Sequence, residues 1–292
     1  MPISVPTYPQ TQLDAQICAQ LRTYGLNVTP SSAFYRHLLF NGPVALAPNN
    51  YISRVKIDAY SFVAENAYIA NLTMGRYCTI CNNAESGIGR HDINNLSTSP
   101  AFLFTPNFIL SHPPIKRMNQ VQRHNQEDYN EVTLGHDVYV GPHACIINDV
   151  TIGTGAVIEA GSIITHDVPP YAIVSGVGGG KDSHGIIKGY RFSDEVISDL
   201  LELKWWEYDL PKLMASTQTE TNSTTPPMPF EHPQDFIAFM RDSDTSTWPR
   251  LDDKWLYLVI KNSKEVQLLP SPPDLKMTPN YPLQLGTDPK WG

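Results

Sequence analysis

The chain has 292 residues and a formal net charge of -8, and only 17% of its residues are charged. This length can bury one or two hydrophobic cores, and the low charge argues against an extended disordered chain. The acidic balance argues against broad binding to nucleic acid or anionic membranes, since both need clustered Lys and Arg, but leaves room for a local site for one phosphorylated cofactor. There is no apolar run of about 18 residues and no signal-peptide pattern, so we expect a soluble cytoplasmic protein without a membrane span.

The N-terminal region predicts a short helix followed by strands. Leu13, Ile17 and Leu21 lie four residues apart within Gln10–Tyr24, a spacing that is typical of the apolar face of a helix. We expect residues 1–50 to pack on the repeat region that follows.

A six-residue repeat is the most informative pattern in the sequence. Aliphatic residues recur every six positions, each followed four places later by a small or β-branched residue: Leu134, Val140, Ile146, Ile152, Ile158 and Ile164. This period fits neither an α-helix nor the two-residue alternation of an amphipathic strand. It predicts a triangular coil whose short strands each turn one aliphatic side chain inward and stack at about 4.8 Å. With one single-residue slip, the same register appears earlier at Ile57, Val63, Ile69, Met74 and Ile80.

The repeat is interrupted from residue 86 to residue 131 and then resumes, which indicates a loop extruded from the coil. Long loops in compact folds are usually functional or disordered. The interruption contains the string Gly87-Ile88-Gly89-Arg90-His91-Asp92 and aromatic residues at 101–104, which argue against simple disorder.

The C-terminal part predicts helices separated by a linker. Phe192–Ala215 has an apolar face, Ser193 as a suitable N-cap and acidic residues in its first turn, so we expect one helix there. After a Thr/Ser/Pro linker at 217–229, we expect a short helix at Gln234–Arg241 and a strand at Trp255–Lys261. The predicted division is an N-terminal unit at 1–50, a β-helix at 51–191, a helix at 192–216 and an extension of unknown role at 217–292.

Two stretches of sequence carry a resemblance to a known family. The first is Gly75-Arg76-Tyr77-Cys78-Thr79-Ile80, followed by Gly89-Arg90-His91 and Ser97-Thr98-Ser99-Pro100-Ala101-Phe102. The second is Asp167-Val168-Pro169-Pro170-Tyr171, followed by Leu203-Lys204-Trp205-Trp206. With the hexads, over roughly Val55–Leu213, they resemble the xenobiotic (CatB-related) branch of the hexapeptide-repeat acetyltransferases. The resemblance implies a mainly β, left-handed parallel β-helix that forms a homotrimer, with active sites at the subunit interfaces and acetyl-CoA as acyl donor.

In this resemblance, His91 occupies the position of the family's catalytic histidine. A neutral histidine can accept the proton of an acceptor hydroxyl, whose oxygen then attacks the thioester carbonyl. Asp92 and Glu85 are the nearest carboxylates in sequence and are candidates to orient His91, although each can also be simply solvated, and a backbone carbonyl could do the same. Gly141, at a coil turn, is a candidate to stabilise the oxyanion through its N–H, or else it serves the turn geometry alone.

The resemblance also implies where coenzyme A binds. Its pantetheine arm would lie along the late coils, at Gly161, Ser162 and Thr165. For the phosphates, the chain offers three cations after the last coil, which are Lys181, Lys188 and Arg191. Here the sequence departs from the family, because the segment 176–182 replaces the expected Gly-Asn-Pro-Ala-Lys with a longer glycine run. This run lacks the Walker spacing, so we interpret it as a flexible loop that could close over the cofactor.

Aromatic residues and one histidine are the candidates for the acceptor site. Phe102 and Phe104 in the interruption, and His143 on the coils, could line it. Trp205 and Trp206 could stack on a sugar, but we expect them to pack their helix against the coil.

We do not expect a metal site. Cys78-x-x-Cys81 lacks a second ligand pair, and Cys78 falls in a small inward position of the repeat. His136 and His143 are seven residues apart, so they do not occupy the same place in successive hexads.

We predict acetyl transfer to a hydroxyl of a saccharide, in a surface polysaccharide or its precursor. The string around His91 resembles the sugar O-acetyltransferases more than the antibiotic-resistance members. The alternatives are an antibiotic (chloramphenicol or streptogramin) O-acetyltransferase, an amino-sugar N-acetyltransferase and a non-catalytic hexapeptide-repeat scaffold. A scaffold would not need His91, so this residue discriminates between an enzyme and a scaffold.

Overall fold

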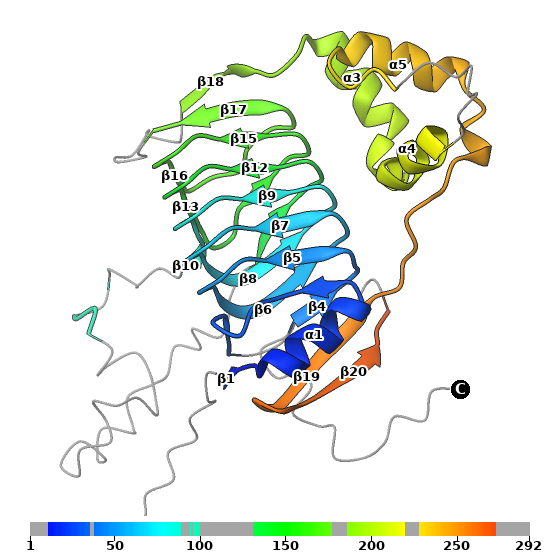
Figure 1. Cartoon of the computed structure of the whole chain (residues 1–292). Helices are drawn as coiled ribbons and strands as arrows, with labels where there is room; N and C mark the ends of the chain where they lie inside the picture. Colours follow the sequence, from blue (N-terminus) through cyan, green and yellow to red (C-terminus); the bar gives the residue numbers. More distant parts are fainter. Residues whose placement is uncertain are drawn as a thin grey trace, which may run out of the picture.

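The computed structural model of the protein describes residues 11–35, 38–88, 94, 96–99, 131–176, 186–219 and 228–272. In these residues the chain winds into a parallel β-solenoid of about six turns, which Figure 1 shows as a stack of short strands with helices near both ends. The fold class predicted from the hexads, a mainly β protein with stacked parallel coils, is confirmed. No helix in the described part of the chain is long and apolar enough to cross a membrane.

One side of the solenoid is a sheet of parallel strands. In spatial order these are β2 (Leu26–Asn27), β5 (Val44–Leu46), β7 (Ser61–Val63), β9 (Thr79–Ile80), β12 (Tyr139–Val140), β15 (Val157–Ile158) and β17 (Ala172–Ser175). Their register aligns one inward aliphatic side chain per coil, each at most 2% exposed: Leu46, Val63, Ile80, Val140, Ile158 and Val174. The predicted start of the β-helix was residue 51. Because β2 and β5 belong to this sheet, the solenoid begins earlier than that.

A second sheet runs around the remaining sides. It contains β6 (Tyr51–Ile57), β8 (Tyr68–Met74), β10 (Glu85–Ile88), β11 (Val132–Leu134), β13 (Cys145–Ile147), β14 (Thr151–Ile152) and β16 (Ile163–Ile164), with β1 (Thr11–Gln12), β3 (Ala33–Phe34) and β4 (Leu38–Phe40) at one end. Leu134 pairs with Met74, so the coil resumes in register after the interruption. Strand β10 continues through Ile88, beyond the predicted start of the interruption, and Ser86 occupies the inward position that Ile69 and Ile146 hold in the neighbouring coils.

Two corners of the solenoid repeat the same left-handed backbone conformation. The aromatic corner has φ values of 55° to 74° at Tyr60, Tyr77, Asp137, Gly155 and Tyr171. The asparagine corner has φ values of 56° to 69° at Asn49, Asn66, Asn83, His143 and Gly161. In successive coils the N–H of such a residue donates to a carbonyl of the preceding coil, as Asn66 does to Pro48 and Tyr77 to Ala59. These bonds stack each set of corner residues into a column.

Helix α1 (Ala15–Thr23) lies at the end of the solenoid where the chain begins. The predicted start at Gln10 is wrong because Thr11 and Gln12 pair with β3 instead. Asp14 then caps the helix, and its side chain accepts a hydrogen bond from the Gln16 N–H at 2.8 Å. Residues Leu13, Ile17 and Leu21 are buried, as their spacing predicted.

At the opposite end, β18 (Ile186–Tyr190) pairs antiparallel with β17 and leads into the helices. These are α3 (Asp194–Leu203), the short 3-10 helix η2 (Trp205–Glu207), α4 (Leu210–Thr219) and α5 (Pro233–Asp242). The predicted single helix over Phe192–Ala215 is wrong because Lys204 adopts a φ of 48° and ends α3. Ser193 caps α3 as predicted, with its hydroxyl accepting from the Val196 N–H at 3.5 Å.

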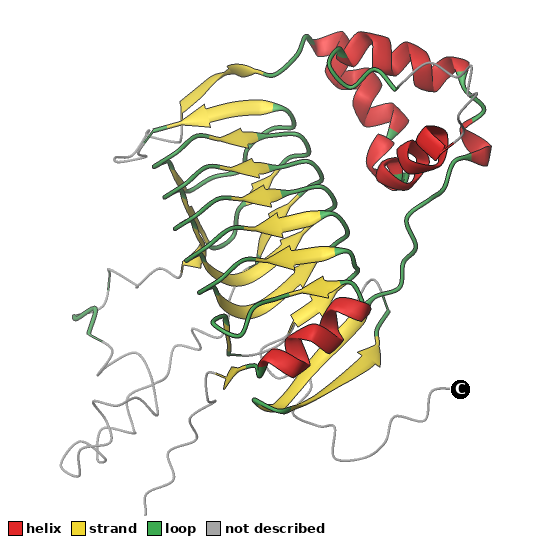
Figure 2. Cartoon of the chain, viewed as in Figure 1, coloured by secondary structure: helices red, strands yellow, loops and turns green. Residues whose placement is uncertain are grey.

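The C-terminal extension runs back along the solenoid, which Figure 2 shows as a loop from the helices to the strands beside β4. It passes through the 3-10 helix η3 (Thr245–Thr247) into a hairpin of β19 (Leu256–Asn262) and β20 (Glu265–Pro270). Strand β19 begins and ends one residue later than the strand predicted at Trp255–Lys261. Strand β19 pairs antiparallel with β4 and so covers a sheet edge that would otherwise be open to pairing with other chains. The extension therefore closes the solenoid at this end.

Candidate active site

Five predicted site residues lie outside the described residues, namely His91, Asp92, Phe102, Phe104 and Lys181. Most of the glycine run before Lys181 lies outside them as well. Their roles as general base, orienting carboxylate, acceptor wall and phosphate ligand therefore stay predictions.

The strand that leads toward His91 is β10. Its first residue, Glu85, has an exposed side chain and pairs with Tyr68 on one neighbouring coil and Cys145 on the other. Its last residue, Ile88, accepts a hydrogen bond from the Asn148 N–H at 3.1 Å, which fixes the point where the chain leaves the solenoid. The orienting role of the Glu85 carboxylate stays a prediction, because His91 lies outside the described residues.

Gly141 lies where two coils approach closely. Its N–H donates to the Ile158 carbonyl at 2.8 Å, and a Cβ at this position would come within 2.7 Å of the Ala160 nitrogen. Packing therefore requires glycine here. The predicted oxyanion role does not fit this geometry, because the N–H is already used between coils.

The predicted pantetheine residues are presented in different ways. Gly161 is exposed at the asparagine corner, and a Cβ there would meet no atom within 4 Å. The Thr165 hydroxyl is partly exposed, 2.7 Å from His166 Nδ1. Ser162 is 0% exposed, and its hydroxyl accepts from the Gly176 N–H at 3.3 Å. Gly161 and Thr165 can therefore contact a ligand on the surface, whereas the Ser162 side chain cannot.

The two described cations after the last coil have different surroundings. Lys188 is exposed on β18. Arg191 Nη1 donates to Asp137 Oδ2 and to the Gly155 carbonyl, both at 2.8 Å, and the guanidinium lies over the rings of Tyr171 and Phe192. Burial raises the pKa of Asp137, and the charge of Arg191 opposes that rise. Arg191 thus holds the aromatic corner to the C-terminal helices, and Lys188 is the better placed of the two to meet a phosphate.

His143 is exposed at the asparagine corner, where a surface-bound acceptor could reach it. Its Nε2 lies 3.5 Å from Asn83 Nδ2, and in earlier coils Asn49 Nδ2 donates to Asn66 Oδ1 at 3.3 Å. The imidazole therefore continues a column of side-chain amides, and its role at the acceptor site stays a prediction.

The C-terminal helices cover the aromatic corner with tryptophans. Trp206 is 6% exposed and stacks on His136, with ring centroids 5.1 Å apart and planes 10° from parallel. The Trp205 ring lies 5.1 Å from that of Tyr77, whose hydroxyl donates to the Tyr208 carbonyl at 2.7 Å. The expectation that these tryptophans pack their segment against the coil is confirmed.

His136 is the most strongly perturbed imidazole among the described residues. Burial lowers its pKa to about 4, with the nearby charge of Arg76 acting in the same direction. Its Nδ1 accepts a hydrogen bond from the Arg76 N–H at 3.1 Å, which a neutral ring allows. This histidine is therefore a structural acceptor rather than an exposed proton carrier.

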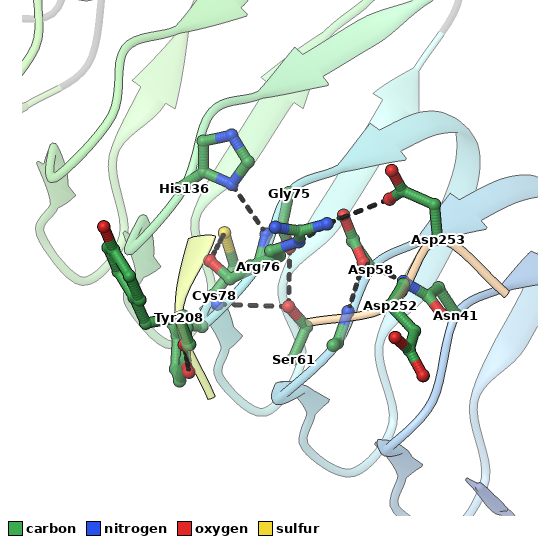
Figure 3. Close-up of polar contacts among 12 residues, drawn as sticks. Asn41, Asp58, Ser61, Gly75, Arg76, Cys78, His136, Tyr208, Asp252 and Asp253 are labelled. Atoms are coloured by element: carbon green, nitrogen blue, oxygen red, sulfur yellow. Dashed lines mark hydrogen bonds and ion pairs between the residues drawn. The ribbon is translucent and has the colours of Figure 1, made fainter. Parts of the chain in front are cut away.

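A charged cluster around the buried Arg76, next to His136, was not predicted from the sequence. Arg76 is 8% exposed and pairs with Asp58 and with Asp253, each at 3.0 Å (Figure 3). The Asn41 amide donates to Asp58 Oδ1 at 2.9 Å and to the Asp252 carbonyl at 2.7 Å. The cluster thus ties the C-terminal extension to the early coils. Its only signal in the sequence was an arginine within a coil of small and aliphatic residues, where a charge needs a partner.

Cys78 occupies the small inward position that the repeat assigned to it. It is 0% exposed, and its thiol donates to the Gly135 carbonyl at 3.0 Å. Burial raises the pKa of this thiol to about 12, so Cys78 stays protonated near neutral pH. In the described ranges, no group of three or more His, Cys, Asp and Glu residues could hold a metal ion.

No protein-family model matches the chain. The chain is 33% identical over 147 residues to a chloramphenicol acetyltransferase of Morganella morganii, covering 50% of this chain and 63% of that protein. It is 36% identical over 105 residues to the galactoside O-acetyltransferase of Escherichia coli (strain K12), covering 32% of this chain and 50% of that protein. The chain thus spans less than two thirds of the length of these two relatives. A solved maltose O-acetyltransferase from Clostridium difficile 630 matches 54% of this chain and 68% of its own, with 16% identity and a TM-score of 0.33.

The fold and these sequence relatives agree with the resemblance described above. The protein is a hexapeptide-repeat β-solenoid. Its curated relatives are acetyltransferases, among them enzymes named for chloramphenicol and for galactosides.

Proposed function

We propose that the chain is an acetyl-CoA-dependent O-acetyltransferase that acts on a saccharide hydroxyl, with His91 as general base. One observation carries the proposal: a stack of hexad coils, interrupted in sequence between Ile88 at the end of β10 and Val132 at the start of β11, coincides with sequence similarity to acetyltransferases over half of the chain. The segment of sequence between these two strands contains His91, in the string that resembles the sugar O-acetyltransferases.

In the proposed reaction, His91 takes the proton from the acceptor hydroxyl while the hydroxyl oxygen attacks the thioester carbonyl. The tetrahedral intermediate then collapses, the carbon–sulfur bond breaks, and the thiol of coenzyme A leaves with the proton returned by His91. The acetyl group passes directly to the acceptor as an ester, without a covalent enzyme intermediate. Glu85 is the described carboxylate that we assign to orienting the imidazole, since it begins the strand leading to the loop.

Coenzyme A would bind along the exposed surface of the late coils. Gly161 and Thr165 offer accessible positions there, and the exposed Lys188 supplies a cation for a phosphate. The described residues therefore offer an anionic cofactor few cationic contacts, as expected for a chain with a net charge of -8.

The proposed assembly is a homotrimer with the acceptor site between subunits. Exposed aromatic side chains on one solenoid side support lateral association: Phe62 on β7 is 40% exposed, and Tyr139 on β12 is 41% exposed. The two are aligned in the same outward column through Thr79. Light scattering coupled to size-exclusion chromatography tests this assembly, and a monomer at micromolar concentration would contradict it.

The experiment that tests the acceptor class is a screen with the full chain and acetyl-CoA that follows free thiol. A galactoside, maltose, chloramphenicol, a macrolide and an amino sugar are offered separately. We expect the saccharides to give the highest kcat/KM, with an ester product by NMR. Chloramphenicol is a second candidate acceptor, favoured by the 33% identical relative. If chloramphenicol were turned over preferentially, the proposed acceptor would change but the proposed reaction would not. An amide product would indicate N-acetylation, and no thiol release with any acceptor would overturn the enzyme proposal.

A further inference from the structure

The chain leaves the solenoid through a β-bulge at the end of β10. Ser86 pairs with Ile146 on the next coil, and the following pair is Ile88 with Ile147. Gly87, between Ser86 and Ile88, is therefore one extra residue on β10. A bulge bends its strand and redirects the residues that follow it, so this bulge sets the direction in which the chain leaves the coil.

Backbone contacts with the coils on both sides fix this bulge. Gly87 has a φ of 77°, and a Cβ at this position would overlap the carbonyl oxygen of Ala70 on the preceding coil, so only glycine fits. On the following coil, the Asn148 N–H donates to the Ile88 carbonyl at 3.1 Å. His91 comes three residues after Ile88 in the sequence. The geometry of the bulge therefore determines where the segment that carries His91 begins.

Ser86 is an unfavourable residue for its position in the core. It occupies an inward column in which the other coils place isoleucine, each at most 1% exposed: Ile52, Ile69, Ile146 and Ile164. Ser86 is 2% exposed, and its hydroxyl has no hydrogen-bond partner in the part of the chain that the structure describes. The position therefore lacks the apolar burial of an isoleucine and leaves a polar group unsatisfied, and both effects lower stability.

A second unsatisfied polar atom lies at the same exit. Asn148, whose N–H bonds to Ile88, also has a buried side-chain oxygen, Oδ1, without a hydrogen-bond partner among the described residues. Proteins depart from the most stable choice of residue chiefly where function requires it. Two such departures flank the end of the strand that leads toward His91. They favour a functional role for this exit over a purely stabilising one.

We propose that Ser86 is a positioning residue for acetyl transfer, an inference that rests on the proposed function. Its small side chain allows the strand to bulge at Gly87, so that the chain leaves the coil in the direction that brings His91 to the reacting atoms. A larger aliphatic side chain would pack in the inward column with Ile69 and Ile146 and would favour the regular pleat over the bulge. The protein would then become more stable and less active.

The test is Ser86→Val in the full chain, with stability, turnover and hydrogen exchange measured on the same protein. The Tm should rise by about 2–4 °C, because a buried valine replaces an unsatisfied hydroxyl. The kcat for thiol release with the best acceptor should fall by about tenfold to a hundredfold, since the catalytic base is displaced, while the KM for acetyl-CoA stays within about twofold. The Asn148 amide should exchange faster by about tenfold, because it loses the Ile88 carbonyl as acceptor.

Two control variants separate position from stability. Ser86→Ala keeps the small volume of serine, so its kcat should return to within about threefold of that of the unaltered chain. Ile52→Val changes the same inward column two coils before the bulge, and it should lower the Tm by about 2–4 °C without changing kcat. If Ser86→Val does not fold, Ser86→Cys, whose side chain is intermediate in volume, takes its place.

The outcomes distinguish this inference from the proposed function. If the unaltered chain releases no thiol with any acceptor, the proposed function fails and the role of Ser86 fails with it. If the unaltered chain is active and a folded Ser86→Val has the same kcat, only the role of Ser86 is overturned. A lower kcat with unchanged exchange at Asn148 would also overturn it, because the bulge would then be intact.

Discussion

The aromatic corner and the asparagine corner share one backbone conformation but differ in what covers them. At both, one residue per coil has a positive φ, and its N–H bonds to the preceding coil. Asparagine tolerates this conformation well, and it occupies the corner that is open to solvent. Bulky tyrosines, for which the conformation is unfavourable, occur at the corner that Trp205 and the following segment cover. The burial of the tyrosine rings offsets the local steric cost. Tyrosine at a positive-φ corner of this solenoid therefore indicates that another element packs there, and asparagine indicates that the corner is open to solvent.

The largest difference between the corners is expected for removal of a tyrosine ring. Tyr77 is half-buried, lies 5.1 Å from the rings of both Tyr60 and Trp205, and donates a hydrogen bond to Tyr208. Tyr77→Ala should lower the free energy of unfolding by about 3 kcal/mol, through the lost packing and an unpaired carbonyl. Denaturant unfolding of the full chain measures this.

The matched control is Tyr68→Ala, since the Tyr68 ring is 39% exposed and stacks on Tyr51 at 4.5 Å without cover from the C-terminal helices. It should cost about 1 kcal/mol. Equal losses for the two variants would contradict the claim that the helices stabilise the tyrosines of the aromatic corner.

A pH effect of intermediate size is expected from His136, which lies beneath Trp206. Burial lowers the folded-state pKa from 6.5 to about 4, so the unfolded chain binds the proton more readily. Stability should be complete above about pH 6.5 and fall as the pH drops toward 4, by on the order of 2 kcal/mol between pH 7 and pH 5. Unfolding curves at several pH values should show this slope reduced in His136→Gln. His143→Gln is the control at the open corner, and a slope that responds to both substitutions alike would contradict the assignment.

The smallest effect is expected at the asparagine corner itself. Asn83 has a φ of 56° and an exposed side chain. Asn83→Ala should cost about 1 kcal/mol because alanine is strained in this conformation, and Asn83→Gly should cost less. Thermal unfolding of the two variants gives the comparison. A glycine variant less stable than the alanine variant would show that the side-chain amide, rather than the backbone conformation, decides the choice of residue here.

The solenoid could be predicted from the sequence because the aliphatic residues that form the six-residue pattern are the same residues that form the core. Outside the interruption, neighbours in the column from Leu46 to Val174 lie 16 to 18 residues apart, close to three hexads, and such a spacing can be recognised without knowledge of any partner. The pattern weakened where Ser86 took an inward place and where the early coils include short strands such as β2. Those positions are recognised only once neighbouring coils are in place.

The candidate site was predicted less completely, for physical reasons that differ between residues. Gly141 looked available for an oxyanion because a sequence does not reveal that its N–H bonds to Ile158. Arg191 looked like a phosphate ligand, yet its partner Asp137 is 54 residues away and meets it only through coil stacking. The cluster of Arg76 with Asp58 and Asp253 joins three separate segments of the chain, so no local sequence motif could predict it.

The most direct test of the central claim, acetyl transfer with His91 as general base, is the rate of thiol release from acetyl-CoA with the best acceptor of the screen. The rate is measured for the unaltered chain and for His91→Ala, with circular dichroism to verify the fold of both. Loss of a general base should reduce kcat/KM by about a hundredfold to ten-thousandfold while the solenoid remains folded. Turnover by a folded His91→Ala at the rate of the unaltered chain would contradict the claim.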